Sequence, residues 1–134
     1  MTSIEFPYRA ERAHGGIIIH RPVAEAVLIG PGGKDVREYL YVDSGADHTL
    51  IPFHLGRYLG LSGGEVHEVR GISGIVGVVY ATMKIDLAGF IFPTRVAWAQ
   101  IEAVPLLLGR ADVFDRFEIT FIQSRLTVVF RAVD

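Results

Sequence analysis

One carboxylate in the sequence, Asp43, lies at a position where it could take part in catalysis. Asp43 follows the apolar run Leu40-Tyr41-Val42 and precedes Ser44 and Gly45. A carboxylate at the end of an apolar strand needs hydrogen bonds or a charged partner to remain ionised. Gly45 permits a tight turn and a close approach to Asp43, while Ser44 adds a hydroxyl. The tripeptide alone also fits an ordinary turn, because all three residue types favour turns.

A second signal is a glycine-rich segment in the middle of the chain. Gly71, Ile72, Ser73 and Gly74 separate two runs that are rich in β-branched residues. Glycine at the ends of such a short connection is typical of a hairpin turn. We therefore expect this segment to form the tip of a hairpin, with one apolar side chain at the tip.

A third signal lies downstream, where the apolar run Val104–Leu108 is followed by Gly109 and Arg110. A short apolar run of this kind is typical of a buried strand. Ala111–Phe114, directly after it, is expected to form a short helix.

In this order, the three signals resemble the retropepsins, which are small aspartic proteases of retroviral type with cellular relatives in bacteria and archaea. The similarity runs from about Val23 to Phe121. It implies an all-β, closed acid-protease barrel with a flap hairpin and one or two short helices. It also implies that the strand ending at Asp43 passes under a strand formed by Leu107-Leu108-Gly109.

The resemblance assigns a role to each matching residue. Asp43 would be catalytic, and Ser44 would hydrogen-bond to the other subunit's loop across the dimer axis. Arg110 would form an ion pair with Asp47. The full set comprises the catalytic segment Asp43, Ser44 and Gly45, the substrate-binding residues Ala46, Asp47, His48, Gly71, Ile72, Ser73, Gly74, Leu106 and Leu107, and the supporting residues Leu108, Gly109 and Arg110.

Two of these assignments are less direct. Core packing is an equally good interpretation of Leu106 and Leu107, and each side chain could serve a different purpose. His48 stands where retroviral members often have a second acidic residue, so substrate preference is expected to differ. The segment 53–64 also departs from the viral proteins in detail.

The chemistry of the family then requires a dimer. Aspartic proteolysis uses two carboxyl groups that share one proton, one acting as base and the other as acid. None of the other aspartates is followed by Ser-Gly or Thr-Gly. The second carboxyl group must therefore be Asp43 of a symmetry-related copy. The apolar C-terminal strand could also pair between subunits, as the termini of retroviral enzymes do.

Length and composition indicate the number of domains, the kinds of binding partner and the cellular location to expect. The 134 residues suit one domain, so residues 1–134 are expected to form a single protease domain. Thirteen basic and 15 acidic residues give no electrostatic reason to expect nucleic acid or a membrane as partner. The chain has no cysteine, and its five histidines lack metal-ligand spacing. We expect no metal and no cofactor, and a soluble, cytoplasmic protein.

Strand and turn residues alternate along the whole chain. Strands are predicted at 17–20, 23–29, 36–42, 65–70, 75–86, 90–100, 104–108, 117–122 and 126–133, with helical turns at 53–59.

The leading hypothesis for the function is an endopeptidase that cleaves extended, hydrophobic peptide segments. The alternative is a retropepsin-like dimerisation or peptide-binding module with little or no proteolysis, since a retained fold does not guarantee retained chemistry.

Overall fold

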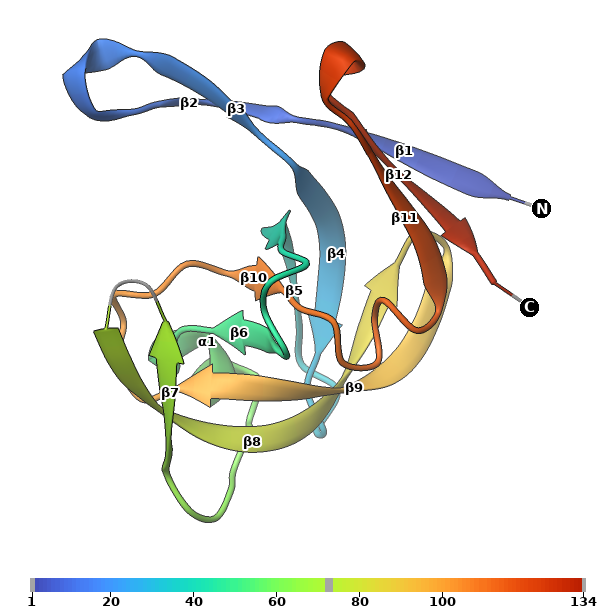
Figure 1. The fold of residues 1–134 in the computed structure, drawn as a ribbon. Helices are drawn as coiled ribbons and strands as arrows, with labels where there is room; N and C mark the ends of the chain where they lie inside the picture. Colours follow the sequence, from blue (N-terminus) through green and yellow to red (C-terminus); the bar gives the residue numbers. More distant parts are fainter. Residues whose placement is uncertain (1, 72–73, 134) are drawn as a thin grey trace.

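The computed structural model describes residues 2–71 and 74–133 and consists mainly of β-strands (Figure 1). The largest sheet contains β4 (Val23–Ile29), β5 (Asp35–Val42), β6 (Thr49–Ile51), β7 (His67–Gly71), β8 (Gly74–Leu87), β9 (Phe90–Ala99) and β10 (Leu107–Leu108). The helix α1 (Phe53–Tyr58) packs beside β9. The expectation of an all-β barrel with short helical segments is confirmed.

The large sheet closes on itself through β4. This strand pairs antiparallel with β5 along its whole length and also with β8 over its second half, where Ala26 to Ile29 face Leu87 to Lys84. The order β4-β5-β10-β6-β9-β8 therefore returns to β4 and forms a closed barrel, while β7 extends β8 outside it. Closure removes the open sheet edges that would otherwise be free to pair with other chains.

Burial alternates along the barrel strands as the strand period requires. On β4, Ala24, Ala26 and Leu28 are buried, while Glu25 and Val27 between them are partly exposed. Successive side chains of a strand point to opposite faces of a sheet, so one face of β4 fills the core. This pattern explains why the sequence predicted β4 with the bounds that the structure shows.

A second sheet lies against the barrel and is built from both ends of the described chain (Figure 1). It contains β1 (Ser3–Pro7), β12 (Thr127–Ala132) and β11 (Phe117–Ile122), in that order. The buried ring of Phe130 makes edge-to-face contacts with Phe6 and Phe117, each with ring centroids 5.5 Å apart. The sequence predictions included β11 and β12 but missed β1, although Ile4, Phe6 and Tyr8 alternate with more polar or turn-forming residues.

A separate hairpin projects from the molecule between these two sheets. It consists of β2 (Arg9–Arg12), a 3₁₀ turn (His14–Gly16) and β3 (Ile18–Arg21). β2 and β3 pair only with each other among the described strands. Figure 1 shows this hairpin standing away from the barrel, on the side where β5 ends.

Two sequence predictions near Gly109 are wrong. The expected strand Val104–Leu108 is reduced to Leu107–Leu108, because Pro105 has no N–H to donate and only the last two residues pair with a neighbour. The expected helix Ala111–Phe114 is a series of turns. Asp112 has φ +66°, outside the helical region, and its carboxylate accepts a hydrogen bond from the Arg95 N–H at 2.8 Å.

The closure of the barrel at β4, called its seam here, predicts how much stability is lost when a cavity is made there. Leu28 is fully buried where β4 faces both β5 and β8. Leu28→Ala should lower the free energy of unfolding by about 2–5 kcal/mol, the usual cost of such a cavity. Chemical denaturation measures this change. Ile91→Ala, at a side chain that is 63% exposed, should change it by no more than about 0.5 kcal/mol; equal effects of the two variants would contradict the assignment of the seam.

Candidate active site

Asp43 lies where two chain segments of the barrel run side by side. It follows the last residue of β5, and β10 runs parallel to that strand, with Leu107 beside Tyr41 and Leu108 beside Val42. The Asp43 N–H donates to the Leu108 carbonyl at 3.0 Å, and the Tyr41 N–H donates to the Leu106 carbonyl at 3.0 Å. The Asp43 strand and Leu107-Leu108, which the resemblance brought together, are therefore paired side by side, and the passage of one under the other stays a prediction.

The loop after Asp43 folds back and holds its carboxylate. The Gly45 N–H donates to the Asp43 Oδ1 at 2.9 Å, and the Ala46 N–H donates to the Asp43 carbonyl at 3.2 Å. A backbone donor aimed at a carboxylate oxygen fixes the orientation of the carboxylate. Asp43 is partly buried, whereas Ser44 and Gly45 are exposed. The hydrogen bond of Ser44 across a dimer axis stays a prediction.

Gly109 is the point at which the returning segment comes closest to the Asp43 loop. A Cβ atom at this position would lie 2.2 Å from the backbone carbonyl of His48, so only glycine fits without moving the backbone. The Gly109 N–H donates to the Thr49 Oγ1 at 3.1 Å, and Thr49 is fully buried. This bond joins the beginning of β6 to the end of β10. Sequence reasoning missed Thr49, although a lone threonine between the loop and Leu50 was a visible signal.

Asp47 and Arg110 form the ion pair that was expected, with the Asp47 Oδ1 and the Arg110 Nη2 2.5 Å apart. Their side chains are 77% and 56% exposed, so the pair contributes less than about 1 kcal/mol to stability. Two backbone hydrogen bonds contribute more to holding the loop after Asp43 in place. The Arg110 N–H donates to the Ala46 carbonyl at 2.9 Å and the Ala111 N–H donates to the Asp47 carbonyl at 2.8 Å.

A hollow of about 540 Å³ lies beside Asp43. Its apolar lining comes from Val42, Leu107, Pro22 and Pro105, and its polar lining from Asp43, Tyr41, Glu11 and Arg21. Of the two adjacent leucines, Leu107 faces this hollow, whereas Leu106 packs against the core cluster. Core packing therefore holds for Leu106, while a substrate-binding role for Leu107 stays a prediction.

Glu11 is the centre of a polar network at one end of this hollow. Its Oε2 accepts hydrogen bonds from the Tyr41 hydroxyl at 2.6 Å and from Arg9 at 2.9 Å, and its Oε1 lies 3.2 Å from the Arg21 Nε. The Tyr41 hydroxyl, followed by Arg9, lowers the pKa of the Glu11 carboxyl below its usual 4.5. Sequence reasoning missed this network because Glu11 on β2 meets Arg21 on β3 and Tyr41 on β5 only in the tertiary structure.

Gly71 and Gly74, two of the expected flap residues, lie at the end of the β7–β8 hairpin. Gly71 pairs with Gly74 there, while Ile72 and Ser73 lie outside the described residues. His48, in the loop after Asp43, lies with its ring 4.9 Å from that of Tyr80 on β8. His67 on β7 contacts the same tyrosine at 5.4 Å. The base of this hairpin is therefore in contact with the Asp43 loop.

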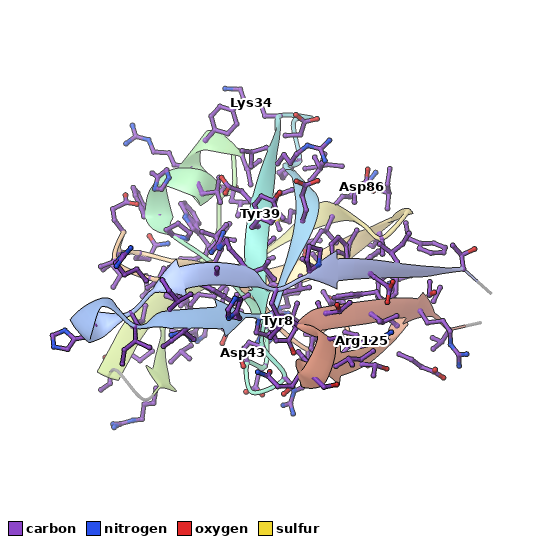
Figure 2. All side chains as sticks on the ribbon, turned by 90° about the horizontal axis from the view of Figure 1, so that it is seen from above. Tyr8, Lys34, Tyr39, Asp43, Asp86 and Arg125 are labelled. Atoms are coloured by element: carbon purple, nitrogen blue, oxygen red, sulfur yellow. The ribbon has the colours of Figure 1, made fainter. Side chains whose placement is uncertain are left out.

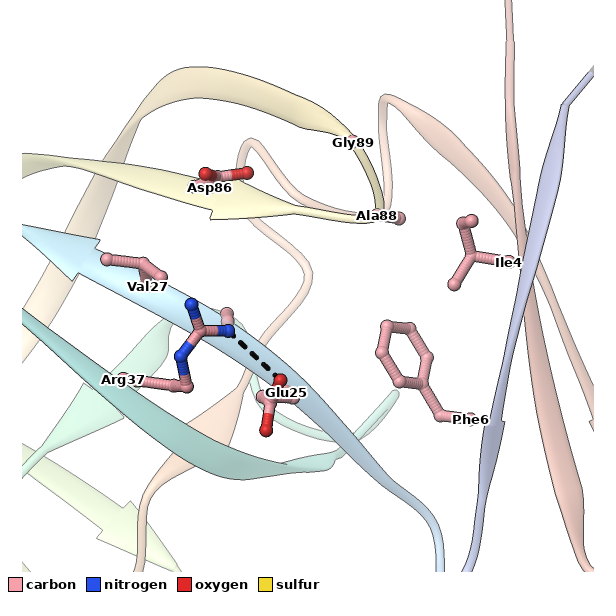
Figure 3. A pocket seen from close by; sticks show the side chains of 9 residues that line it. Ile4, Phe6, Glu25, Val27, Arg37, Asp86, Ala88 and Gly89 are labelled. Carbon is pink, nitrogen blue, oxygen red and sulfur yellow. Dashed lines mark hydrogen bonds and ion pairs between the residues drawn. The ribbon is translucent and has the colours of Figure 1, made fainter.

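Two further hollows lie away from Asp43. One, between β1 and the barrel, has Ile4 and Phe6 on one side and the Arg37–Glu25 ion pair, at 3.0 Å, on the other (Figure 3). The other lies next to α1, where His54 Nδ1 and the Glu102 Oε1 are 2.6 Å apart. Within residues 2–71 and 74–133, no group of three His, Asp or Glu side chains could hold a metal, and no helix is long and apolar enough to cross a membrane.

Comparison with known proteins gave one kind of match. No family model matches the sequence, and no curated protein matches it. Among solved structures, the chain is similar to an EIAV protease complexed with the inhibitor HBY-793. The two sequences are 22% identical, and the superposition covers 67% of this chain and 82% of that one with a TM-score of 0.49.

The bond between Thr49 and Gly109 predicts a stability effect at the site. Thr49→Val keeps the shape of the side chain but leaves the buried Gly109 N–H without its acceptor. An unsatisfied buried donor costs about 1–3 kcal/mol, and the free energy of unfolding should fall by that amount. Thr120→Val, on the exposed surface of β11, is the matched control. Thermal and urea unfolding that leave Thr49→Val as stable as the control would contradict this role.

The Glu11 network predicts a pH-dependent contribution to stability. Because the folded protein lowers the pKa of Glu11, the network stabilises the fold above the unfolded pKa near 4.5 and loses this effect as the pH falls through the lower, folded value. Tyr41→Phe should cost about 1 kcal/mol of unfolding free energy at pH 7, and the difference from the unmodified protein should shrink below pH 4.5. Tyr58→Phe, at a side chain 51% exposed on α1, is the control; a Tyr41→Phe deficit that does not change with pH would refute this account.

Proposed function

We propose that this chain is one subunit of a homodimeric aspartic endopeptidase, in which Asp43 and its counterpart in a second copy form the catalytic pair. The observation that carries the proposal is the position of Asp43. Its carboxylate lies at the end of β5, where β10 pairs beside this strand, is oriented by the Gly45 N–H, and lines an open hollow.

The reaction needs both copies because one carboxyl group cannot act as base and acid at once. The ionised carboxylate takes a proton from a water molecule, whose oxygen attacks the carbonyl carbon of the peptide bond. The other, protonated carboxyl group gives its proton to the carbonyl oxygen. Two carboxylates a few ångströms apart cannot both be charged, and aspartic proteases are the standard example of this effect. The shared proton belongs to the pair and not to either residue.

The surroundings of Asp43 favour an extended peptide as substrate. Val42, Leu107 and Pro105 give the hollow an apolar floor, which suits hydrophobic side chains near the cleaved bond. The β7–β8 hairpin would close over the peptide as a flap, and its backbone groups would hydrogen-bond to the peptide as to an added strand. His48, which contacts Tyr80 of this hairpin, would link the movement of the flap to the Asp43 loop.

The decisive test is Asp43→Asn in the full chain. The variant should fold and dimerise, but its kcat/KM on a peptide library should fall by at least about 10²-fold, because it loses the acid–base pair. Asp35→Asn, at the exposed start of the same strand, is the matched control and should retain activity. The unmodified protein should be most active at acidic pH and be inhibited by pepstatin.

Two results would contradict the proposal. Cleavage by the folded, dimeric Asp43→Asn variant at the unmodified rate would place the chemistry elsewhere. Peptide binding without cleavage by the unmodified protein between pH 3 and pH 8 would instead favour a dimerisation or peptide-binding module.

A further inference from the structure

The hairpin of residues 9–21, called the arm here, is largely exposed. It comprises β2, the 3₁₀ turn and β3, and its strands pair only with each other among the described strands. Three consecutive isoleucines near its tip, Ile17, Ile18 and Ile19, are 65%, 50% and 36% exposed. Figure 1 shows the arm extending away from both sheets, and Figure 2 shows it crossing in front of the barrel when the molecule is seen from above.

An arm of this kind is poorly stabilised by its own contacts. An isolated two-stranded hairpin is at best marginally stable in water, because it has no third strand or helix to cover its apolar face. Adjacent exposed isoleucines add unfavourable contact with water. Ile18 and Ile19 are successive residues of β3, so they point to opposite sides of the arm and leave apolar side chains exposed on both. Burying these side chains against another molecule is favourable.

The base of the arm is fixed beside Asp43. Tyr41, two residues before Asp43 on β5, donates its hydroxyl hydrogen to Glu11 on β2 at 2.6 Å. Glu11 also pairs with Arg21 on β3, and Glu11 and Arg21 both line the hollow that contains Asp43. The arm therefore leaves the body of the protein from the rim of the candidate active site, in a direction that this network sets.

The arm and the rest of the chain carry opposite net charges. Residues 9–21 contain Arg9, Arg12 and Arg21 against Glu11, a net charge of +2. The remaining ten basic and 14 acidic residues give the rest of the chain −4. A second copy therefore offers a body that attracts the arm electrostatically, and such complementarity guides association more than it adds affinity.

We propose that the arm binds a second copy of this chain, with the isoleucines at its tip buried against that copy. This inference rests on the proposed function, since it takes the dimer from it. A copy that brings its own Asp43 next to this one must approach the hollow whose rim is the base of the arm. The tip of the arm, directed outward from that rim, then lies against the approaching copy, and two-fold symmetry gives the same contact twice.

The first experiment measures the dimer dissociation constant by analytical ultracentrifugation of the full chain. Ile17→Ser should raise this constant at least tenfold, because the variant loses apolar contact in two symmetric places. Ile91→Ser is the matched control, since Ile91 on β9 is 63% exposed and Ile17 is 65% exposed. Circular dichroism should show both variants folded. Equal dissociation constants for Ile17→Ser, Ile91→Ser and the unmodified dimer would overturn the proposal.

The second experiment tests the charge of the arm. Arg12→Glu should raise the dissociation constant and reduce its dependence on salt, because salt screens attraction between opposite charges. Arg57→Glu, on the exposed side of α1, is the control and should leave both quantities near those of the unmodified protein. Equal salt dependence of Arg12→Glu and the unmodified protein would contradict an electrostatic role for the arm.

The third experiment uses the absence of cysteine from the sequence. Ile18→Cys provides a single thiol near the tip, to which a benzophenone maleimide can be attached. Irradiation of the dimer should give cross-links between two chains, which mass spectrometry of mixed isotope-labelled and unlabelled chains identifies. Cross-links within one chain only would overturn the proposal.

The experiments distinguish a wrong inference about the arm from a wrong proposed function. If the arm does not bind the second copy, the protein still dimerises and cleaves peptides, and the arm variants behave like their controls. If the proposed function is wrong, the unmodified protein is monomeric or shows no cleavage that depends on Asp43.

Discussion

The two-residue strand β10 is the contact on which the site depends. It lies between β5 and β6, parallel to the first and antiparallel to the second, and its last carbonyl receives the Asp43 N–H. Without it, the end of β5 would have an unpaired edge and the Asp43 loop would lack its support. The close approach of Gly109 to His48 shows how tightly the two segments meet.

The pairing of β10 with β5 explains how a partly buried carboxylate can be held in an apolar barrel. The polar groups around Asp43 are mainly backbone N–H groups and carbonyls, which the loop and β10 satisfy in pairs. The exposed Asp47–Arg110 pair adds to this support but does not replace it.

Much of the fold followed from local patterns. β4 and β11 have the predicted bounds, because alternating burial and flanking turns are visible in the sequence. The predictions were wrong where a long-range contact decided the conformation. Asp112 adopts a positive φ and its carboxylate binds the backbone of β9, which no local pattern around residues 111–114 indicates. β1 was missed because its partner, β12, lies at the other end of the chain.

The sequence by itself identified one candidate catalytic residue, Asp43, and no second Asp-Ser-Gly or Asp-Thr-Gly segment to supply the other carboxyl group of a catalytic pair. One Asp-Ser-Gly segment, the downstream Leu-Leu-Gly-Arg and the glycine pair between them are visible without coordinates. Only the tertiary structure decided what surrounds Asp43. Thr49 reaches Gly109, Leu107 faces the hollow while Leu106 packs inward, and Glu11 approaches Tyr41 across 30 residues of chain. Such contacts depend on which strands pair and in which register, and pairing between distant segments leaves no local trace in the residues that it joins.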